Sequence, residues 1–171
     1  MPAHNGPMTS ADLLLKSVAA VEYGGRRYVI SPLPTTALVP IWVARLRELE
    51  VGLLVRLSED QSYTAQDLGD IRFVEFPLQD GAVPNSEQVT AWNELAEGFF
   101  KCNPGRALAI HCTAGLGRSA VVVAISLMNA RLSAEKAIEL IRSKRKGALN
   151  AKQVAFVLDY KAKRRRKFCC V

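Results

Sequence analysis

The chain has 171 residues, of which 49% are hydrophobic and 23% charged, so it fits one globular domain and is neither fully disordered nor fibrous. Its formal net charge of +7 comes from one end, because residues 131–171 hold 13 Lys/Arg against 3 Asp/Glu, whereas residues 1–130 are slightly acidic. The longest apolar run, at 120–128, is too short to cross a bilayer, and the N-terminal residues lack a signal-peptide pattern, so we expect an intracellular protein.

Apolar runs and helical patterns alternate along the chain. Short apolar runs bounded by turn residues predict strands at 27–30, 51–57, 71–76 and 107–110. Apolar residues at helical spacing predict helices at 39–49, 89–99, 119–130, 133–142 and 150–160, the last with Asn150 and Gln153 as a capping box. Strands that alternate with helices indicate an α/β fold with a central, mostly parallel sheet flanked by helices. We predict one domain over 21–160, with an N-terminal extension at 1–20 and a tail at 161–171.

The chemistry is concentrated in HCTAGLGRS, residues 111–119, between the strand at 107–110 and the apolar helix that follows. A loop with two glycines before a helix N-terminus forms an anion site, because backbone N–H groups point inward and the helix dipole adds positive potential. Arg118 would bind two phosphate oxygens, and the same positive field would lower the pKa of Cys112 and make it a thiolate nucleophile. The predicted phosphate-binding residues are Thr113, Ala114, Gly115, Leu116, Gly117 and Arg118.

The alternative for Cys112 is a structural cysteine in a strand-to-helix turn. A chance match to the pattern H-C-x-x-G-x-x-R-[ST] in a chain of this length has a probability on the order of 10⁻⁵. The pattern therefore favours the nucleophile.

A thiolate that attacks phosphorus needs an acid for the departing oxygen and then a base for water, and one carboxyl can serve both roles. Asp80, in FPLQDG just after a strand, is the candidate. Asp60, Asp67, Asp70 and Glu75 compete with it on the sequence alone. A surface aspartate in an Asp-Gly turn is the alternative role of Asp80.

Ser119 and His111 stand at the two ends of the predicted loop. Ser119 could donate a hydrogen bond to the Cys112 sulfur and help it leave, and it could also cap the following helix. His111 is expected to orient the loop by hydrogen bonds rather than to exchange protons, with a buried structural histidine as the alternative. No cysteine or histidine pair has zinc spacing, so we expect no metal and no cofactor.

HCTAGLGRS resembles the phosphate loop of cysteine-based protein tyrosine and dual-specificity phosphatases. AGLGR, the segment KRKGALNAKQ at 144–153 and the Cys-Cys tail resemble the PRL type, or type IVA, over about residues 21–171. The resemblance implies the cysteine-phosphatase fold and metal-independent hydrolysis of phosphotyrosine, phosphoserine/threonine or phosphoinositides through a phosphocysteine. It also places Asp80 in the family's acid loop, since FPLQDGAVP matches that loop, and it gives Gln153 a supporting place in the site.

Three residues depart from the PRL pattern. Ser119 stands where that type usually has alanine, which is held to slow turnover, so we predict faster hydrolysis of the phosphocysteine than is usual in the family. Gln79 replaces a second acidic residue beside Asp80. Ser58 stands where the family has a cysteine that can pair with the nucleophile, and Cys102 is a weak substitute for it.

The segment 161–171 joins six basic residues to Phe-Cys-Cys-Val. Basic residues attract an anionic membrane surface, and an attached lipid would supply the second signal that stable anchoring requires. The ending is not a C-a-a-X box as written, but with one further residue it would match the family's prenylated ending, with Cys169 as the lipid acceptor. We therefore expect the cytoplasmic face of the plasma or endosomal membrane, or the cytosol when the tail is unmodified.

Three functions follow from these observations. The first is a membrane-associated phosphatase. The second is a binding module with little turnover, for which the resemblance implies CBS-domain magnesium transporters as partners. Ser119 argues against a stalled enzyme, and the presence of Cys112, Asp80 and Arg118 together argues against an inactive one. The third is another C-x5-R enzyme, such as a rhodanese or arsenate reductase, against which the acid loop argues. Nucleic acid is not expected as a partner, because a basic run without interleaved aromatic residues supports only non-specific binding.

Overall fold

The computed structural model describes residues 7–161, and its centre is a five-stranded sheet in the order β1-β2-β5-β3-β4. Every neighbouring pair is parallel except β1 and β2, which are antiparallel. The central strand β5 is buried along its whole length, because helices cover both faces of the sheet. This confirms the predicted α/β architecture. The strands are β1 (Ala19–Tyr23), β2 (Arg26–Pro32), β3 (Val51–Arg56), β4 (Arg72–Glu75) and β5 (Ala107–Cys112).

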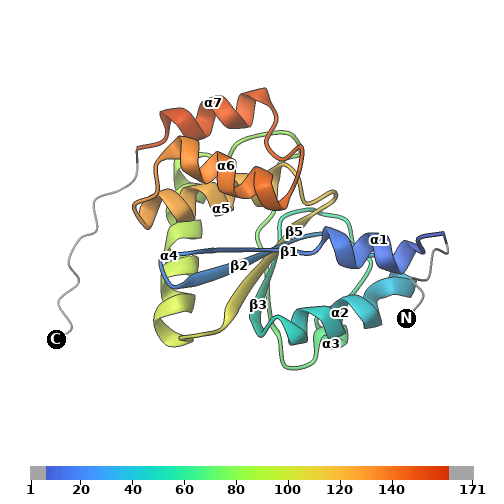
Figure 1. The fold of residues 1–171 in the computed structure, drawn as a ribbon. Helices are drawn as coiled ribbons and strands as arrows, with labels where there is room; N and C mark the ends of the chain where they lie inside the picture. The colour runs from blue at the N-terminus through green and yellow to red at the C-terminus, as the bar shows by residue number, and fades with distance from the viewer. Residues whose placement is uncertain (1–6, 162–171) are drawn as a thin grey trace, which may run out of the picture.

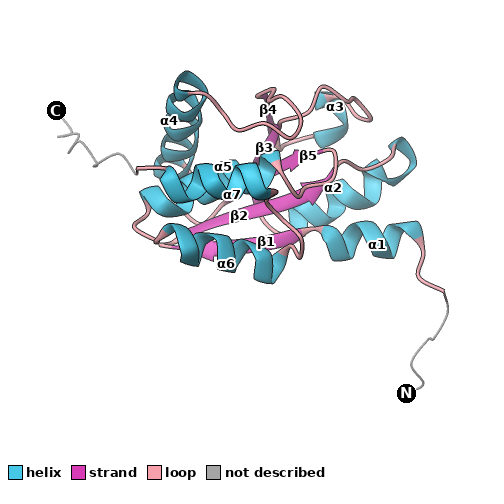
Figure 2. Cartoon of the chain, turned by 90° about the horizontal axis from the view of Figure 1, so that it is seen from above, coloured by secondary structure: helices cyan, strands magenta, loops and turns pink. Residues whose placement is uncertain are grey.

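Two groups of helices cover the two faces of the sheet (Figures 1 and 2). One face carries α1 (Ser10–Ser17), α2 (Val39–Glu48) and α3 (Ala65–Leu68), with a 3-10 helix, η1 (Thr36–Leu38), leading into α2. The other carries α4 (Ser86–Cys102), α5 (Arg118–Asn129), α6 (Ala134–Lys144) and α7 (Ala151–Asp159). Among the described residues, we find no helix with the length and apolar content that a membrane span requires.

The side chains of β5 alternate between the two layers, as a strand requires. Leu108 and Ile110 face α4–α7, whereas Ala107 and Ala109 face the α1–α3 side. α5 is buried from Arg118 to Met128, which explains why its sequence is apolar on all sides. The strand and the helix on either side of the HCTAGLGRS loop are therefore the most enclosed elements of the molecule.

Residues 10–20, which the sequence assigned to an N-terminal extension, belong to the folded part of the chain. A capping box begins α1, and Leu14 anchors this helix in the same core as α2. β1 joins β2 through Gly24 and Gly25, whose φ angles of +59° and +75° suit a two-residue hairpin turn. The folded domain thus begins before residue 21. The tail at 162–171, with Cys169, lies outside the described residues.

The predicted helix starts agree with the structure at α7 but not at α5. At α7, Asn150 and Gln153 form the expected capping box, with bonds of 2.9 and 3.0 Å. At α5, the N-cap residue is Gly117 and no side chain caps the helix, so the N-cap role considered for Ser119 is wrong. The glycine leaves the first N–H groups of α5 without a side-chain acceptor from its own cap.

Candidate active site

The predicted phosphate loop, residues 113–117, connects the C-terminal end of β5 to α5. β5 lies between β2 and β3, and the loop leaves the sheet at the edge where the carboxyl ends of the parallel strands meet. Ligands of open α/β sheets bind at this edge, where the strand order reverses. Cys112, the last residue of β5, is only 3% exposed and faces this edge of the sheet.

Four successive carbonyl groups of the phosphate loop point outward, to partners on other segments. Because a trans peptide group is planar, the N–H that follows each carbonyl points the opposite way, toward the concave side of the loop. The four outward bonds therefore produce the row of inward N–H groups that an anion needs. The partners are Leu33 N for Thr113 O (3.0 Å), Arg145 for Ala114 O (2.8 Å) and Gly115 O (3.3 Å), and Leu149 N for Leu116 O (2.8 Å).

Only glycine fits at position 115. Its φ is +66°, a conformation that L side chains rarely adopt, and a Cβ there would lie 2.5 Å from the carbonyl oxygen of Ser31. The second glycine of the motif, Gly117, lies against the amide of Gln153, which a Cβ would approach to 3.0 Å. The two glycines thus let the loop press against β2 on one side and α7 on the other.

Opposing effects act on the thiol of Cys112. Burial raises its pKa. Hydrogen bonds from the Ser119 hydroxyl and from the backbone N–H groups of Ser119 and Gly115 lower it, as does the charge of Arg118, and together they outweigh the effect of burial. The net result is a pKa below the ordinary value of a cysteine. Ser119 Oγ is fully buried and has no oxygen or nitrogen partner among the described residues, so its interaction is with this sulfur.

Arg118 joins the phosphate loop to the segment that holds the predicted acid. Its Nη2 lies 3.0 Å from Thr113 Oγ1 and 2.9 Å from Asp80 Oδ1, and its Nη1 donates to Leu78 O at 3.2 Å. The arginine is only 6% exposed, whereas the side chain of Asp80 is 87% exposed. The structure therefore brings Asp80 to the site, on a loop that we define as residues 77–82 and call the acid loop.

Three of the four competing carboxylates are used elsewhere: Asp67 caps α3, Asp70 pairs with Arg47 and Glu75 pairs with Arg56. Asp60 is different, because its Oδ2 accepts a hydrogen bond from Thr113 Oγ1 at 2.9 Å. It therefore touches the rim of the phosphate loop through a threonine, while Asp80 contacts the arginine directly.

Besides the Arg118–Leu78 bond, the acid loop has four hydrogen bonds to its surroundings, of which one is Gln88 Nε2 to Pro77 O at 3.5 Å. Leu78 N donates to Leu57 O at 3.0 Å, Asn150 Nδ2 donates to Gly81 O at 3.4 Å, and Gln153 Nε2 donates to Ala82 O at 3.3 Å. Asn150 and Gln153 also form the capping box of α7, so the start of this helix fixes both amides. A pocket of about 230 Å³ between Asp80, Leu116 and Gln153 opens beside these groups.

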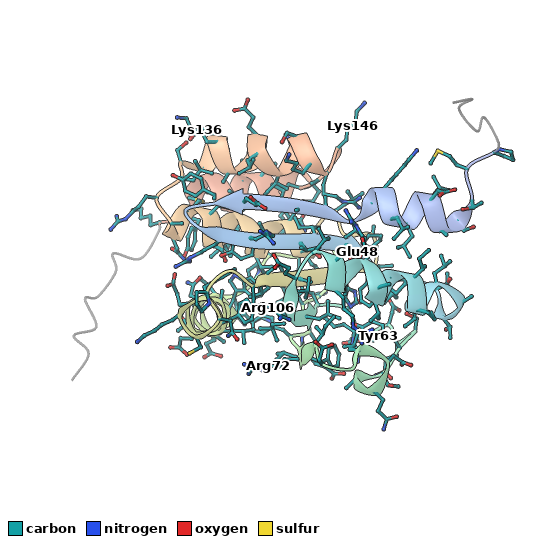
Figure 3. The ribbon with its side chains drawn as sticks, turned by 60° about the horizontal axis from the view of Figure 1, so that its bottom comes forward. Glu48, Tyr63, Arg72, Arg106, Lys136 and Lys146 are labelled. Carbon is teal, nitrogen blue, oxygen red and sulfur yellow. The ribbon has the colours of Figure 1, made fainter. Side chains whose placement is uncertain are left out.

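His111 is completely buried and holds the end of β5. Its Nδ1 lies 3.4 Å from Cys112 O, and its Nε2 pairs with the hydroxyl of Tyr63, which Figure 3 labels. Burial lowers the pKa of His111 to about 4, so the imidazole is neutral near pH 7. A neutral, enclosed imidazole positions its neighbours and does not exchange protons at that pH.

Cys112 has no disulfide partner at position 58, which holds a serine, and the substitute considered, Cys102, lies far from it. Ser58 is buried, and its hydroxyl has no partner among the described residues. Cys102 ends α4 on the surface and precedes β5, so the length of β5, roughly 16 Å, separates its region from Cys112. A disulfide requires Cα atoms within about 7 Å.

Arg145 and Leu149 were not predicted from the sequence, and Asp60 was considered only as a competitor of Asp80. Arg145 stands in a run of basic residues that is typical of a solvated surface, and its partners lie 30, 31 and 128 residues away. Leu149 has a φ of +66°, which costs a non-glycine residue about 1–2 kcal/mol and which no pattern in the sequence indicates. The segment KRKGALN, matched to a family but not interpreted residue by residue, was the only available signal.

Comparison with known proteins agrees with this geometry. Residues 39–163 match the family described as "Dual specificity phosphatase, catalytic domain". The chain is 36% identical to the "PRL-1 phosphatase" of Drosophila melanogaster, over 87% of this chain and 85% of the relative, and 35% identical to the human "Protein tyrosine phosphatase type IVA 3", over 88% and 93%. A putative protein tyrosine phosphatase from Leishmania major has a similar structure, with a TM-score of 0.69, 31% identity and coverage of 80% of this chain and 89% of that one.

The fold and the site are those of a dual-specificity phosphatase catalytic domain. Within that class, the chain belongs to the type IVA, or PRL-type, protein tyrosine phosphatases. The resemblance stated from the sequence is confirmed, and none of these relatives supports the alternative of a binding module with little turnover.

Proposed function

We propose that this phosphatase hydrolyses phosphotyrosine in proteins through a phosphocysteine on Cys112. One observation carries the assignment: Arg118, the arginine of the phosphate loop, contacts Thr113 in that loop and Asp80 in the acid loop at 3.0 and 2.9 Å. A nucleophile, a phosphate clamp and a proton donor thus share one site, as phosphoryl transfer to a thiolate requires.

In the first step, the Cys112 thiolate attacks phosphorus, and the sulfur–phosphorus bond forms as the bond to the tyrosine oxygen breaks. The inward N–H groups of the phosphate loop and the guanidinium of Arg118 bind the equatorial phosphate oxygens. Protonated Asp80 gives its proton to the departing phenolate oxygen, so that tyrosine leaves as a neutral phenol. The exposure of Asp80 allows its side chain to meet a substrate that approaches from solvent.

In the second step, the Asp80 carboxylate takes a proton from a water molecule whose oxygen attacks the phosphorus of the phosphocysteine. The sulfur–phosphorus bond breaks, inorganic phosphate forms, and the sulfur leaves as a thiolate. The buried hydroxyl of Ser119 stabilises that thiolate by the hydrogen bond that lowers the pKa of Cys112. A serine at 119 therefore supports a faster second step than the alanine usual in PRL-type enzymes.

The test is release of inorganic phosphate from a phosphotyrosine peptide and, in parallel, from phosphoinositide vesicles. Multiple turnovers are expected on the peptide, none with Cys112→Ser, and about 10²-fold slower turnover with Asp80→Ala. Asp70→Ala is the matched control, since Asp70 is an exposed carboxylate that pairs with Arg47 away from the site, and it should leave the rate unchanged. A single burst of phosphate followed by silence in the wild-type protein would contradict the proposal, and preference for the vesicles would replace the substrate class.

Ser119→Ala tests the second step alone. The first step should remain fast while the phosphocysteine accumulates, seen as a burst whose amplitude equals the enzyme concentration and as an added phosphate mass on the Cys112 peptide. Steady-state turnover should fall by about tenfold, the loss expected for one hydrogen bond to a charged group. Equal burst kinetics in the two proteins would remove Ser119 from the mechanism.

The basic segment at 161–171 supports a finer proposal about location. Six basic residues beside Cys169 would bind anionic membranes when the cysteine carries a lipid. The family resemblance alone supports a CBS-domain magnesium transporter as a partner. Sedimentation with phosphatidylserine vesicles, with and without residues 161–171, tests the membrane arm separately from catalysis.

A further inference from the structure

Arg145, in the loop between α6 and α7, makes three hydrogen bonds to backbone carbonyls on two distant segments. Its Nη2 donates to Ala114 O at 2.8 Å and its Nε donates to Gly115 O at 3.3 Å, both in the phosphate loop. Its Nη1 donates to Ser17 O at 2.8 Å, at the last residue of α1. The planar guanidinium can serve three acceptors in fixed directions, which a lysine ammonium on a flexible stem does less precisely.

The two bonds to the phosphate loop control the direction of two peptide groups. Ala114 O and the N–H of Gly115 belong to one peptide plane, so a carbonyl held on Arg145 points that N–H at the opposite side, where it meets the Cys112 sulfur. Gly115 O and the N–H of Leu116 form the next plane in the same way. Arg145 thus sets the orientation of donors that a bound phosphate or thiolate would use.

Leu149, four residues after Arg145, binds the next peptide group of the phosphate loop. Its N–H donates to Leu116 O at 2.8 Å, and its φ of +66° is the strained conformation that aims the N–H there. Strain held at a functional site is maintained by the surrounding packing, and Leu149 is 3% exposed. Three successive carbonyls of the phosphate loop therefore bind the single segment 145–149.

The third bond of Arg145 reaches a helix that contributes no residue to the site. Figures 1 and 2 show the end of α1 beside the end of α6, and Figure 3 labels Lys146, the residue after Arg145, at this junction. The carbonyls at the C-terminus of a helix carry partial negative charge, so Ser17 O is a suited acceptor for a cation. Leu14 fixes α1 in the core with α2, which makes the helix a firm support.

We propose that Arg145 is a positioning residue of the phosphate loop, and that through it α1 supports the orientation of the backbone donors that face Cys112. The inference rests on the proposed function, because these donors matter only if the loop binds phosphate and stabilises a thiolate. The hydrogen bonds of Arg145 go to backbone carbonyls of the loop and of α1 and not to the Cys112 sulfur.

Several charged groups surround Cys112, and each of them can influence the pKa of its thiol. Arg118, the first residue of α5, contacts the phosphate loop and forms an ion pair with Asp80. Asp60 contacts the loop through a hydrogen bond from Thr113. His111 is neutral near pH 7. Within residues 7–161, Arg145 is a second cation whose charge interacts with the Cys112 thiolate. A variant must therefore distinguish the loss of this charge from the loss of the geometry.

The test compares Arg145→Met and Arg145→Lys with the wild-type full chain. The pKa of Cys112 is measured from the pH dependence of iodoacetamide alkylation, followed by mass spectrometry on the Cys112 peptide because other cysteines are present. The same proteins are assayed for kcat and KM with p-nitrophenyl phosphate. Arg106→Met is the matched control: Arg106 donates to one carbonyl, Val51 O at 2.9 Å, at the opposite end of β5 (Figure 3).

Arg145→Met should raise the pKa of Cys112 and lower kcat/KM by about tenfold to a hundredfold, the range for a lost orienting contact. Arg145→Lys should keep the thiolate pKa closer to the wild-type value yet still lower kcat, because it retains the charge without the fork. Arg106→Met should change neither quantity. An unchanged pKa and unchanged kinetics in both Arg145 variants would overturn the proposal, and if Arg145→Met fails to fold, the kcat of Arg145→Lys decides.

The role of α1 is tested by a double-mutant cycle with Leu14→Ala. In the wild-type background this change loosens α1 and should lower kcat/KM several-fold, whereas in Arg145→Met it should add nothing, because the link is already cut. Additive effects would show that α1 acts independently of Arg145 and would overturn that part. If the wild-type enzyme released no phosphate, the proposed function would fail, but the alkylation data on Cys112 would still report whether Arg145 orients the loop.

Discussion

The two loops of the site differ in how they are held: the phosphate loop is fixed by short hydrogen bonds, and the acid loop is held more loosely. Three carbonyls of the phosphate loop accept hydrogen bonds of 2.8 to 3.3 Å from the segment 145–149, two from the Arg145 guanidinium and one from the Leu149 N–H. The acid loop at 77–82 is bound through one backbone N–H, by Arg118 Nη1 at 3.2 Å and by three side-chain amides at 3.3 to 3.5 Å, and the side chain of Asp80 is 87% exposed. The groups that we propose to bind phosphate are thus preorganised, while the proposed acid, which would change its partner between steps, is left movable.

Arg118 is the residue that connects the two regions, so its replacement should have the largest effect. Arg118→Lys keeps the charge but cannot contact Thr113, Leu78 and Asp80 together as the planar fork does. We expect kcat/KM for a phosphotyrosine peptide to fall by at least about 10²-fold, with KM rising as well as kcat falling. A loss of less than tenfold would mean that the fork is not the phosphate clamp.

Gly115 and Gly81 offer a direct comparison of the firm region with the loose one. Their φ angles are +66° and +65°, but a Cβ on Gly115 would strike Ser31 O at 2.5 Å, whereas nothing lies within 4 Å of a Cβ on Gly81. Gly115→Ala should lower the free energy of unfolding by about 3 kcal/mol or more, and Gly81→Ala by about 1 kcal/mol, as measured by urea denaturation. Equal losses would show that backbone strain alone governs both sites.

The histidine behind the firm region makes stability depend on pH. Since burial lowers the pKa of His111 from 6.5 to about 4, the unfolded chain binds the proton more tightly, and stability should fall as pH drops from about 6.5 toward 4. The loss attributable to this group is up to about 3 kcal/mol. His111→Asn should flatten the slope of unfolding free energy against pH in this window, and an unchanged slope would show that other groups cause it.

The contrast between these regions also explains what could be predicted from the sequence. Cys112, Arg118 and the glycines could be predicted as site residues because nine adjacent residues carry the proposed nucleophile, the proposed phosphate clamp and the glycines of the loop together. Asp80 was the candidate from its place after a strand, but four other carboxylates competed with it, and the family resemblance strengthened that choice. The α/β order of elements followed from hydrophobic periodicity, except for α1, β1, α3 and η1, which are short. Of these, α1 and β1 depend on contacts with α2 and β2.

The residues that hold the phosphate loop, such as Arg145, could not be predicted from the sequence because their partners are distant along the chain. The partners of Arg145 lie up to 128 residues away. The sequence alone does not distinguish an arginine that binds backbone carbonyls from one that is solvated. The N-cap expectation for Ser119 was wrong because the helix begins at a glycine that sequence preference ranks below serine. A site that keeps its first N–H groups for a ligand must go without the usual cap.

The smallest effect is expected where the acid loop meets α7. Asn150→Ser keeps a good N-cap oxygen for Gln153 N but removes the Nδ2 bond to Gly81 O at 3.4 Å, a length at which a hydrogen bond contributes little. Stability should change by no more than about 0.5 kcal/mol and kcat by less than about threefold. A tenfold loss of kcat with unchanged stability would mean that the acid loop needs a fixed position as much as the phosphate loop does. The phosphate loop and the acid loop would then differ in the lengths of their hydrogen bonds but not in how strictly catalysis depends on their positions.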